Sequence, residues 1–194
     1  MTEKTKTRID DLVNILPDED KMIYRDVAEH AAKLGYSPSK IKDTHEPVIF
    51  AKNVKNYGYR RLCKISPPNL ASGEGQQTNL ALSFYAVSDF SQIFHESVRK
   101  ECESRKEINV VSDYSEVFRH ENVKSKCNFR KESCDKCRKC KDYYYTYPCG
   151  KIISCCHTYL IELPPISAEH VDEIKSMMKA QHECWTHHLN SEKG

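Results

Sequence analysis

The stretch Leu80-Ala81-Leu82-Ser83-Phe84-Tyr85-Ala86 sets the architecture that the rest of the chain must match. Its larger apolar residues alternate with smaller or more polar ones, which is typical of a half-buried β-strand. Ser88 follows as a candidate N-cap, and apolar residues then recur every three to four positions, as on one face of a helix. That face comprises Phe90, Ile93, Phe94, Val98 and Cys102. The stretch therefore predicts a strand that leads into an amphipathic helix.

Helical periodicity is also clear near the N-terminus. Residues 1–8 look like a frayed tail, and apolar positions three to four apart predict a short helix over 9–16. A longer helix is expected over 18–34, because Asp18 can cap its first turn and Gly35 suits the position after its last turn. Strands are expected next, at 48–50 and 57–65.

The C-terminal part of the chain predicts a hairpin and a final helix. Tyrosines alternate through 142–147, Pro148-Cys149-Gly150 has turn chemistry, and 152–163 is the expected return strand. A helix over 167–188 should follow, with a buried stripe of Val171, Ile174, Met178 and Trp185.

The order of these elements is helices, strands, helix, hairpin and helix, joined by short connections. This order predicts an α+β fold, an antiparallel β-sheet packed with helices, which also carries a small cysteine-rich metal-binding insertion. The regular alternation of strands and helices that a doubly wound parallel sheet requires is missing from the sequence. The length of 194 residues fits a single domain over 1–194.

Composition narrows the possible classes of protein. Charged residues make up 30% and hydrophobic residues 39%, which excludes a disordered chain. The sequence contains no run of about 18 apolar residues, the length that could cross a membrane. The net charge of +2 does not by itself indicate nucleic acid or membrane binding. The first residues carry charges without an apolar stretch behind them, so we expect no secretory signal and a cytoplasmic protein with reduced thiols.

Cysteine is the unusual residue, with ten copies. Three are isolated and are expected to be small packed side chains: Cys63, Cys102 and Cys184. The other seven fall within thirty residues: Cys127, Cys134, Cys137, Cys140, Cys149, Cys155 and Cys156. Two residues between thiolates let a tight turn direct both sulfurs at one ion, so Cys134-x-x-Cys137-x-x-Cys140 predicts three ligands of a metal site.

A closed structural site needs a fourth ligand, and the hairpin discriminates among the candidates. If the turn forms as expected, Tyr143 faces Cys155, and the far end of the return strand comes back to the level of Cys140. Cys149, in the turn, then lies roughly 20–30 Å from Cys140 at about 3.3 Å per residue. Adjacent strand residues point to opposite faces, and Cys155 falls on the apolar face, so we predict Cys156 as the fourth ligand. A register shift of one residue would select Cys155 instead.

The predicted ligands are thus Cys134, Cys137, Cys140 and Cys156, within a module over 122–156. Four thiolates suit zinc, and a strand cysteine joined to this spacing resembles a zinc ribbon or knuckle. An iron–sulfur cluster, reversible thiol chemistry and cysteines without a common role are the alternatives. We therefore expect a non-enzymatic zinc-binding protein whose structural four-cysteine site supports a surface for a protein or small-molecule partner.

Two weaker signals accompany the cysteines. Residues 124–141 carry a net charge of +6 beside a row of tyrosines, which could bind single-stranded nucleic acid, although offsetting a charged metal centre explains the basic residues better. The end of the last helix carries His182, Cys184, His187 and His188, which we expect to face solvent.

Parts of the chain resemble the YdhG-like superfamily of small bacterial α+β proteins, which includes a frataxin-like iron chaperone. The resemblance lies in five stretches: Ile15-Leu16-Pro17, Tyr24-Arg25-Asp26-Val27-Ala28, Leu80–Ala86 running into Phe90–Cys102, Leu163-Pro164-Pro165, and Ile174-Lys175-Ser176-Met177-Met178. It implies a sheet covered by helices and a bacterial cytosolic protein, and it makes iron handling an alternative function. The cysteine segment has no counterpart in that superfamily.

Overall fold

The computed structural model describes residues 1–54, 58–68, 77–87, 89–104, 109–111, 143–150, 152–155 and 160–187, with backbone alone at 109–111, 154–155 and 187. The chain divides into two compact units. Unit 1 comprises Met1–Phe90 and Leu160–Gly194, and unit 2 comprises Ser91–Tyr159. A single domain over 1–194 and a metal module over 122–156 stay predictions.

Unit 1 begins with two helices, α1 (Glu3–Asn14) and α2 (Asp18–Lys33). The prediction of a frayed tail was wrong, because the Thr2 side chain accepts a hydrogen bond from the Thr5 amide and so caps α1 at the start of the chain. The helix predicted over 18–34 is confirmed. It ends before Gly35, whose φ of 87° is the left-handed conformation that glycine adopts without strain.

The sheet of unit 1 has five strands in the order β1-β2-β3-β4-β8, and every neighbouring pair is antiparallel. The strands are β1 (Ser37–Pro38), β2 (Val48–Val54), β3 (Gly58–Ser66), β4 (Asn79–Leu82) and β8 (Ile161–Glu162). β4 is shorter than the strand predicted from alternation, because Phe84 to Val87 close a turn through a backbone hydrogen bond. The antiparallel sheet predicted from the sequence is confirmed.

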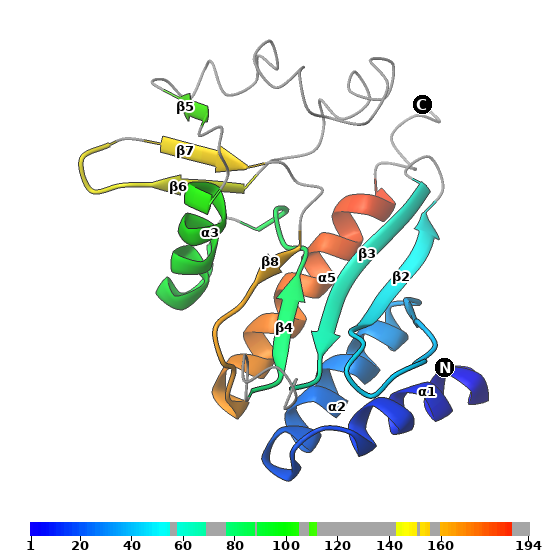
Figure 1. Cartoon of the computed structure of the whole chain (residues 1–194). Coiled ribbons are helices and arrows are strands. Elements are labelled where there is room, and N and C mark those ends of the chain that lie inside the picture. The colour runs from blue at the N-terminus through cyan, green and yellow to red at the C-terminus, as the bar shows by residue number, and fades with distance from the viewer. Residues whose placement is uncertain are drawn as a thin grey trace, which may run out of the picture. The chain divides into compact units, whose positions relative to one another are not determined.

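The core of unit 1 lies between this sheet and its helices. Phe50, Cys63, Leu82 and Ile161 are successive cross-strand partners, and all four are fully buried. The helices α2 and α5 (Val171–His187) lie on one side of the sheet (Figure 1), so they cover the face that carries this row. Apolar burial of this kind contributes about 25 cal/mol per Å².

The last helix has the buried stripe that its periodicity predicted: Val171, Ile174, Met178 and Trp185. The short 3-10 turn η1 (Ala168–His170) precedes α5, and Ser167 caps it in a reciprocal exchange of hydrogen bonds with His170. The predicted start of the helix at 167 is therefore close to the observed one.

Unit 2 consists of α3 (Gln92–Ser104) and a three-stranded antiparallel sheet in the order β5-β7-β6. Its strands are β5 (Asn109–Val111), β6 (Tyr143–Thr146) and β7 (Ile152–Cys155). The helix packs on the hairpin formed by β6 and β7 (Figure 1), and the buried side chains of α3 are Phe94, Ser97, Val98 and Cys102.

The return strand predicted over 152–163 was wrong as a single strand. β7 ends at Cys155 and pairs with β6, whereas Ile161 and Glu162 pair with β4 in the other sheet. The backbone amide of Leu163 also donates to Leu80, which extends that second pairing. Periodicity alone cannot show which partner strand an apolar run joins. Here the two ends of the predicted strand join different sheets.

Candidate functional site

All four predicted metal ligands, Cys134, Cys137, Cys140 and Cys156, lie outside the described residues, as does the basic segment 124–141. Within the described part of the chain, no group of three or more His, Cys, Asp or Glu side chains is arranged to hold a metal ion. The same part contains no helix long and apolar enough to cross a membrane.

The hairpin beside the predicted ligands has the register derived from its turn. Tyr143 pairs with Cys155 and Thr146 with Ile152. Gly150, at φ 84°, allows the turn, and its amide donates to the Tyr147 carbonyl over 2.9 Å. Cys149 is an exposed residue of that turn, at the opposite end of the hairpin from Tyr143.

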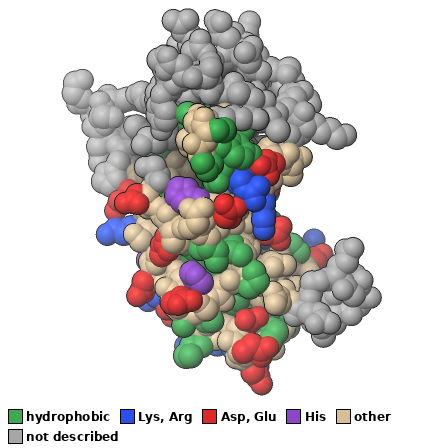
Figure 2. All heavy atoms as spheres, turned by 90° about the vertical axis from the view of Figure 1, so that its left-hand side faces the viewer, with side chains coloured by type: hydrophobic (Ala, Val, Ile, Leu, Met, Phe, Trp, Pro, Cys, Tyr) green, Lys and Arg blue, Asp and Glu red, His purple; other side chains and the backbone are tan. Residues whose placement is uncertain are grey.

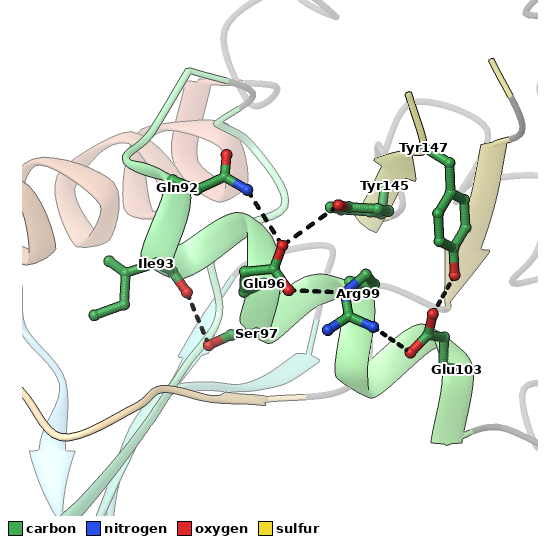
Figure 3. Close-up of polar contacts among 8 residues, drawn as sticks. All are labelled: Gln92, Ile93, Glu96, Ser97, Arg99, Glu103, Tyr145 and Tyr147. Carbon is green, nitrogen blue, oxygen red and sulfur yellow. Dashed lines mark hydrogen bonds and ion pairs between the residues drawn. The ribbon is translucent and has the colours of Figure 1, made fainter. Parts of the chain in front are cut away.

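A polar network fastens the hairpin to α3 (Figure 3). The Arg99 guanidinium lies between two carboxylates, with Nε donating to Glu96 over 2.7 Å and Nη1 donating to Glu103 over 2.7 Å. The Tyr145 hydroxyl donates to Glu96 over 3.4 Å, and the Tyr147 hydroxyl donates to Glu103. Glu96 therefore joins Tyr145 of β6 to the helix, and Glu103 joins Tyr147, the residue just after β6.

The network shifts two pKa values in opposite directions. The hydrogen bond from Arg99 lowers the pKa of Glu96, because it favours the carboxylate. The hydrogen bond to Glu103 raises the pKa of Tyr147 to about 12, because loss of the phenolic proton would place two negative charges side by side. At neutral pH the network therefore holds an ionised Glu96 and a neutral Tyr147 phenol.

The row of alternating tyrosines is engaged within unit 2. Tyr143 is 2% exposed, and the rings of Tyr145 and Tyr147 meet edge to face with centroids 5.0 Å apart. These contacts favour a structural role for the row over a free stacking platform for bases. On the described part of the face in Figure 2, Asp and Glu side chains lie among Lys and Arg ones.

Two of the isolated cysteines are packed thiols, as predicted. Cys63 and Cys102 are fully buried, and burial raises the pKa of the Cys63 thiol, which keeps it protonated. Cys184 is only half-buried.

A second group of reactive side chains lies in unit 1, centred on Lys52 of β2. The Lys52 ammonium donates to the Leu34 carbonyl over 3.0 Å and to Nδ1 of His182 over 3.0 Å. It also lies 4.4 Å from the ring centroid of Tyr36, whose hydroxyl is 3.4 Å from the same histidine nitrogen. The Tyr36 ring further packs near Trp185, with centroids 6.1 Å apart. Strand β2, helix α5 and the connection between α2 and β1 therefore bring an amine, an imidazole and a phenol together.

This cluster was missed at the level of sequence, and the expectation that His182 faces solvent was wrong. His182 is half-buried because it lies one turn before the buried Trp185 on α5, so it shares part of the inward face. That spacing is the one sequence signal for its burial. Lys52 offered a similar signal, since it follows the buried Phe50 by two positions in a strand.

No family model, curated protein or solved structure matches this chain significantly. The resemblance to the YdhG-like superfamily stays a prediction, together with the bacterial, cytosolic protein that it implies.

Proposed function

We propose that this chain is a non-enzymatic zinc-binding protein in which Cys134, Cys137, Cys140 and Cys156 hold one structural zinc ion. In this proposal the ion orders a basic surface segment that meets a protein or small-molecule partner. The proposal includes a reducing, cytoplasmic setting, because thiolates bind metal only while they remain reduced. The chemical basis is the Cys-x-x-Cys-x-x-Cys spacing, which suits tetrahedral zinc with Zn–S bonds of about 2.3 Å.

The hairpin register is the observation that supports this ligand set most directly. Tyr143 lies three residues after Cys140, and it pairs with Cys155. If the pairing continues by one residue, Cys156 lies opposite residue 142 and within short reach of Cys140. Position 155 pairs with the buried Tyr143, so strand alternation would turn position 156 toward the opposite face if the strand continued.

Three of the other described cysteines are poor candidates for ligands, which supports the same set. Cys63 and Cys102 are fully buried and belong to apolar cores. Cys149 lies in the hairpin turn, six residues before Cys155, which corresponds to roughly 20 Å at about 3.3 Å per residue. In the proposed site the ligands gather at the Cys155 end of the hairpin, so the Cys149 thiolate would be too far away to join them.

Energetics explain why such a segment would need a metal. Residues 122–141 contain almost no aliphatic side chains, so burial offers little against a backbone ordering cost of roughly 1–2 kcal/mol per residue. Thiolate–metal bonds would have to supply the stabilisation that burial does not, and the hairpin fastened to α3 would provide a rigid base beside them.

Metal analysis of protein purified without added metal tests the proposal. We expect about one equivalent of zinc and a colourless solution. Iron with a brown colour and absorbance near 400 nm would replace the proposal with an iron–sulfur or iron-handling protein. Absence of both metals, with thiols that oxidise and reduce reversibly, would replace it with a thiol-based sensor or oxidoreductase.

A further inference from the structure

The Lys52 cluster of unit 1 has no role in the zinc proposal, and its chemistry is distinct. Lys52 lies on the helix-covered face of β2, with buried Phe50 and Val54 two positions before and after it. Within the described residues no carboxylate forms an ion pair with its ammonium, whose polar partners are a carbonyl oxygen and an imidazole nitrogen. Burial lowers the pKa of Lys52, because partial loss of water disfavours the charged amine.

A proton acceptor is already in contact with the amine. Nδ1 of His182 accepts from Lys52 over 3.0 Å, so this nitrogen carries a lone pair in the arrangement shown. The Tyr36 hydroxyl lies 3.4 Å from the same nitrogen, and burial raises the pKa of this phenol, which keeps it protonated. The amine thus has a base at hydrogen-bond distance, and a neutral phenol lies close to the same imidazole nitrogen.

We propose that Lys52 is a nucleophilic amine that condenses with small carbonyl compounds carrying a carboxylate, with His182 as its base and Tyr36 as a positioning residue. The Lys52 ammonium passes one proton to Nδ1 of His182, and the freed electron pair attacks the carbonyl carbon. The carbonyl oxygen becomes a hydroxyl as the nitrogen loses a second proton, and His182 then protonates that hydroxyl. Water leaves, and a C=N bond joins Lys52 to the ligand.

Charge on the sheet sets the class of carbonyl compound. Arg60 is the direct cross-strand partner of Lys52, so two cationic side chains stand next to each other on one face. Two neighbouring cationic side chains attract a ligand carboxylate more strongly than one. The half-buried setting of Lys52 favours a ligand of few atoms, such as a 2-oxo acid.

The test is reductive trapping with glyoxylate. The full-length protein is incubated with limiting glyoxylate and cyanoborohydride, and modified lysines are mapped by mass spectrometry. Lys64 is the internal control, because it is also half-buried in the same sheet. It follows Cys63 directly and pairs with Ile49, so its side chain lies on the opposite face of the sheet. We expect several-fold more label on Lys52 than on Lys64. Equal or lower labelling of Lys52 would overturn the proposal.

Two further arms test the assigned parts. His182→Gln should lower labelling of Lys52 several-fold and leave labelling of Lys64 unchanged, since glutamine cannot take the proton. An unchanged rate of Lys52 labelling would remove His182 from the mechanism.

Acetaldehyde, which lacks the carboxylate, should give a smaller ratio of Lys52 to Lys64 labelling than glyoxylate. An equal ratio would show that the carboxylate is not recognised.

Discussion

Tyr143 of β6 lies directly opposite Cys155 of β7, at the end of the hairpin farthest from its turn. This pairing places Cys149 in the turn at the far end. Under the zinc proposal this register separates Cys149 from the proposed ligands, because Tyr143 follows Cys140 by three residues in the sequence.

Substitution of two cysteines tests this division. Cys137→Ser should abolish zinc binding, because a structural site cannot close with three of its four thiolates. Cys149→Ser should leave the zinc content near that of the unchanged protein, because this residue lies in the exposed turn. Inductively coupled plasma mass spectrometry of the purified variants measures both. Equal metal loss in the two variants would show that the ligands include the turn.

Alkaline titration tests the contact between Tyr147 and Glu103. Tyr147 should lose its phenolic proton at a pH near 12, above its usual value of 10.0, and Glu103→Gln should move the pKa back toward 10.0. Because the pKa is raised in the folded protein, the stability that this contact contributes is fully present below pH 10 and is lost as the pH rises to about 12. NMR titration of the ring carbon next to the hydroxyl, assigned with Tyr147→Phe, gives the value. A pKa that stays near 12 in the Glu103→Gln variant would contradict the assignment.

The hairpin and the tertiary clusters differ in how far local sequence could predict them. Two strands joined by a tight turn have a register set by that turn, so Pro148 and Gly150 were enough to pair Tyr143 with Cys155. The hydrogen bond between Lys52 and His182 joins residues 130 positions apart, and no local periodicity links them. The assignment of Ile161 to β4 rather than to β6 is of the same long-range kind.

Backbone conformation at the end of α2 gives a prediction about stability. Gly35 has a φ of 87°, which costs other L-residues about 1–2 kcal/mol. An added Cβ would meet only Lys52 Nζ, at 3.8 Å, which is an ordinary contact. Gly35→Ala should therefore lower the free energy of unfolding by about 1–2 kcal/mol through backbone strain rather than crowding.

Urea denaturation measures this loss, and Gly35→Asn is the matched control. Asparagine is larger than alanine but tolerates the left-handed region better, so it should be the less destabilising of the two. If the asparagine variant is the less stable one, crowding against Lys52 rather than φ controls the site.

Removal of the metal should loosen the cysteine segment of unit 2 and leave unit 1, α3 and most of the hairpin folded. The cores of α2, α5 and the five-stranded sheet are apolar, and α3 holds the hairpin through Tyr145 and Tyr147, so none of these contacts needs an ion. After chelation, hydrogen exchange should become fast over about 122–142 and at the start of the hairpin, while the amides of α3 and of unit 1 stay protected. Return of zinc in slight excess should restore protection and serves as the control.

Loss of protection throughout the chain would mean that the metal lies in a main core. Unchanged exchange over 122–142 would mean that the cysteines clamp no structure, and the zinc proposal would fail with it.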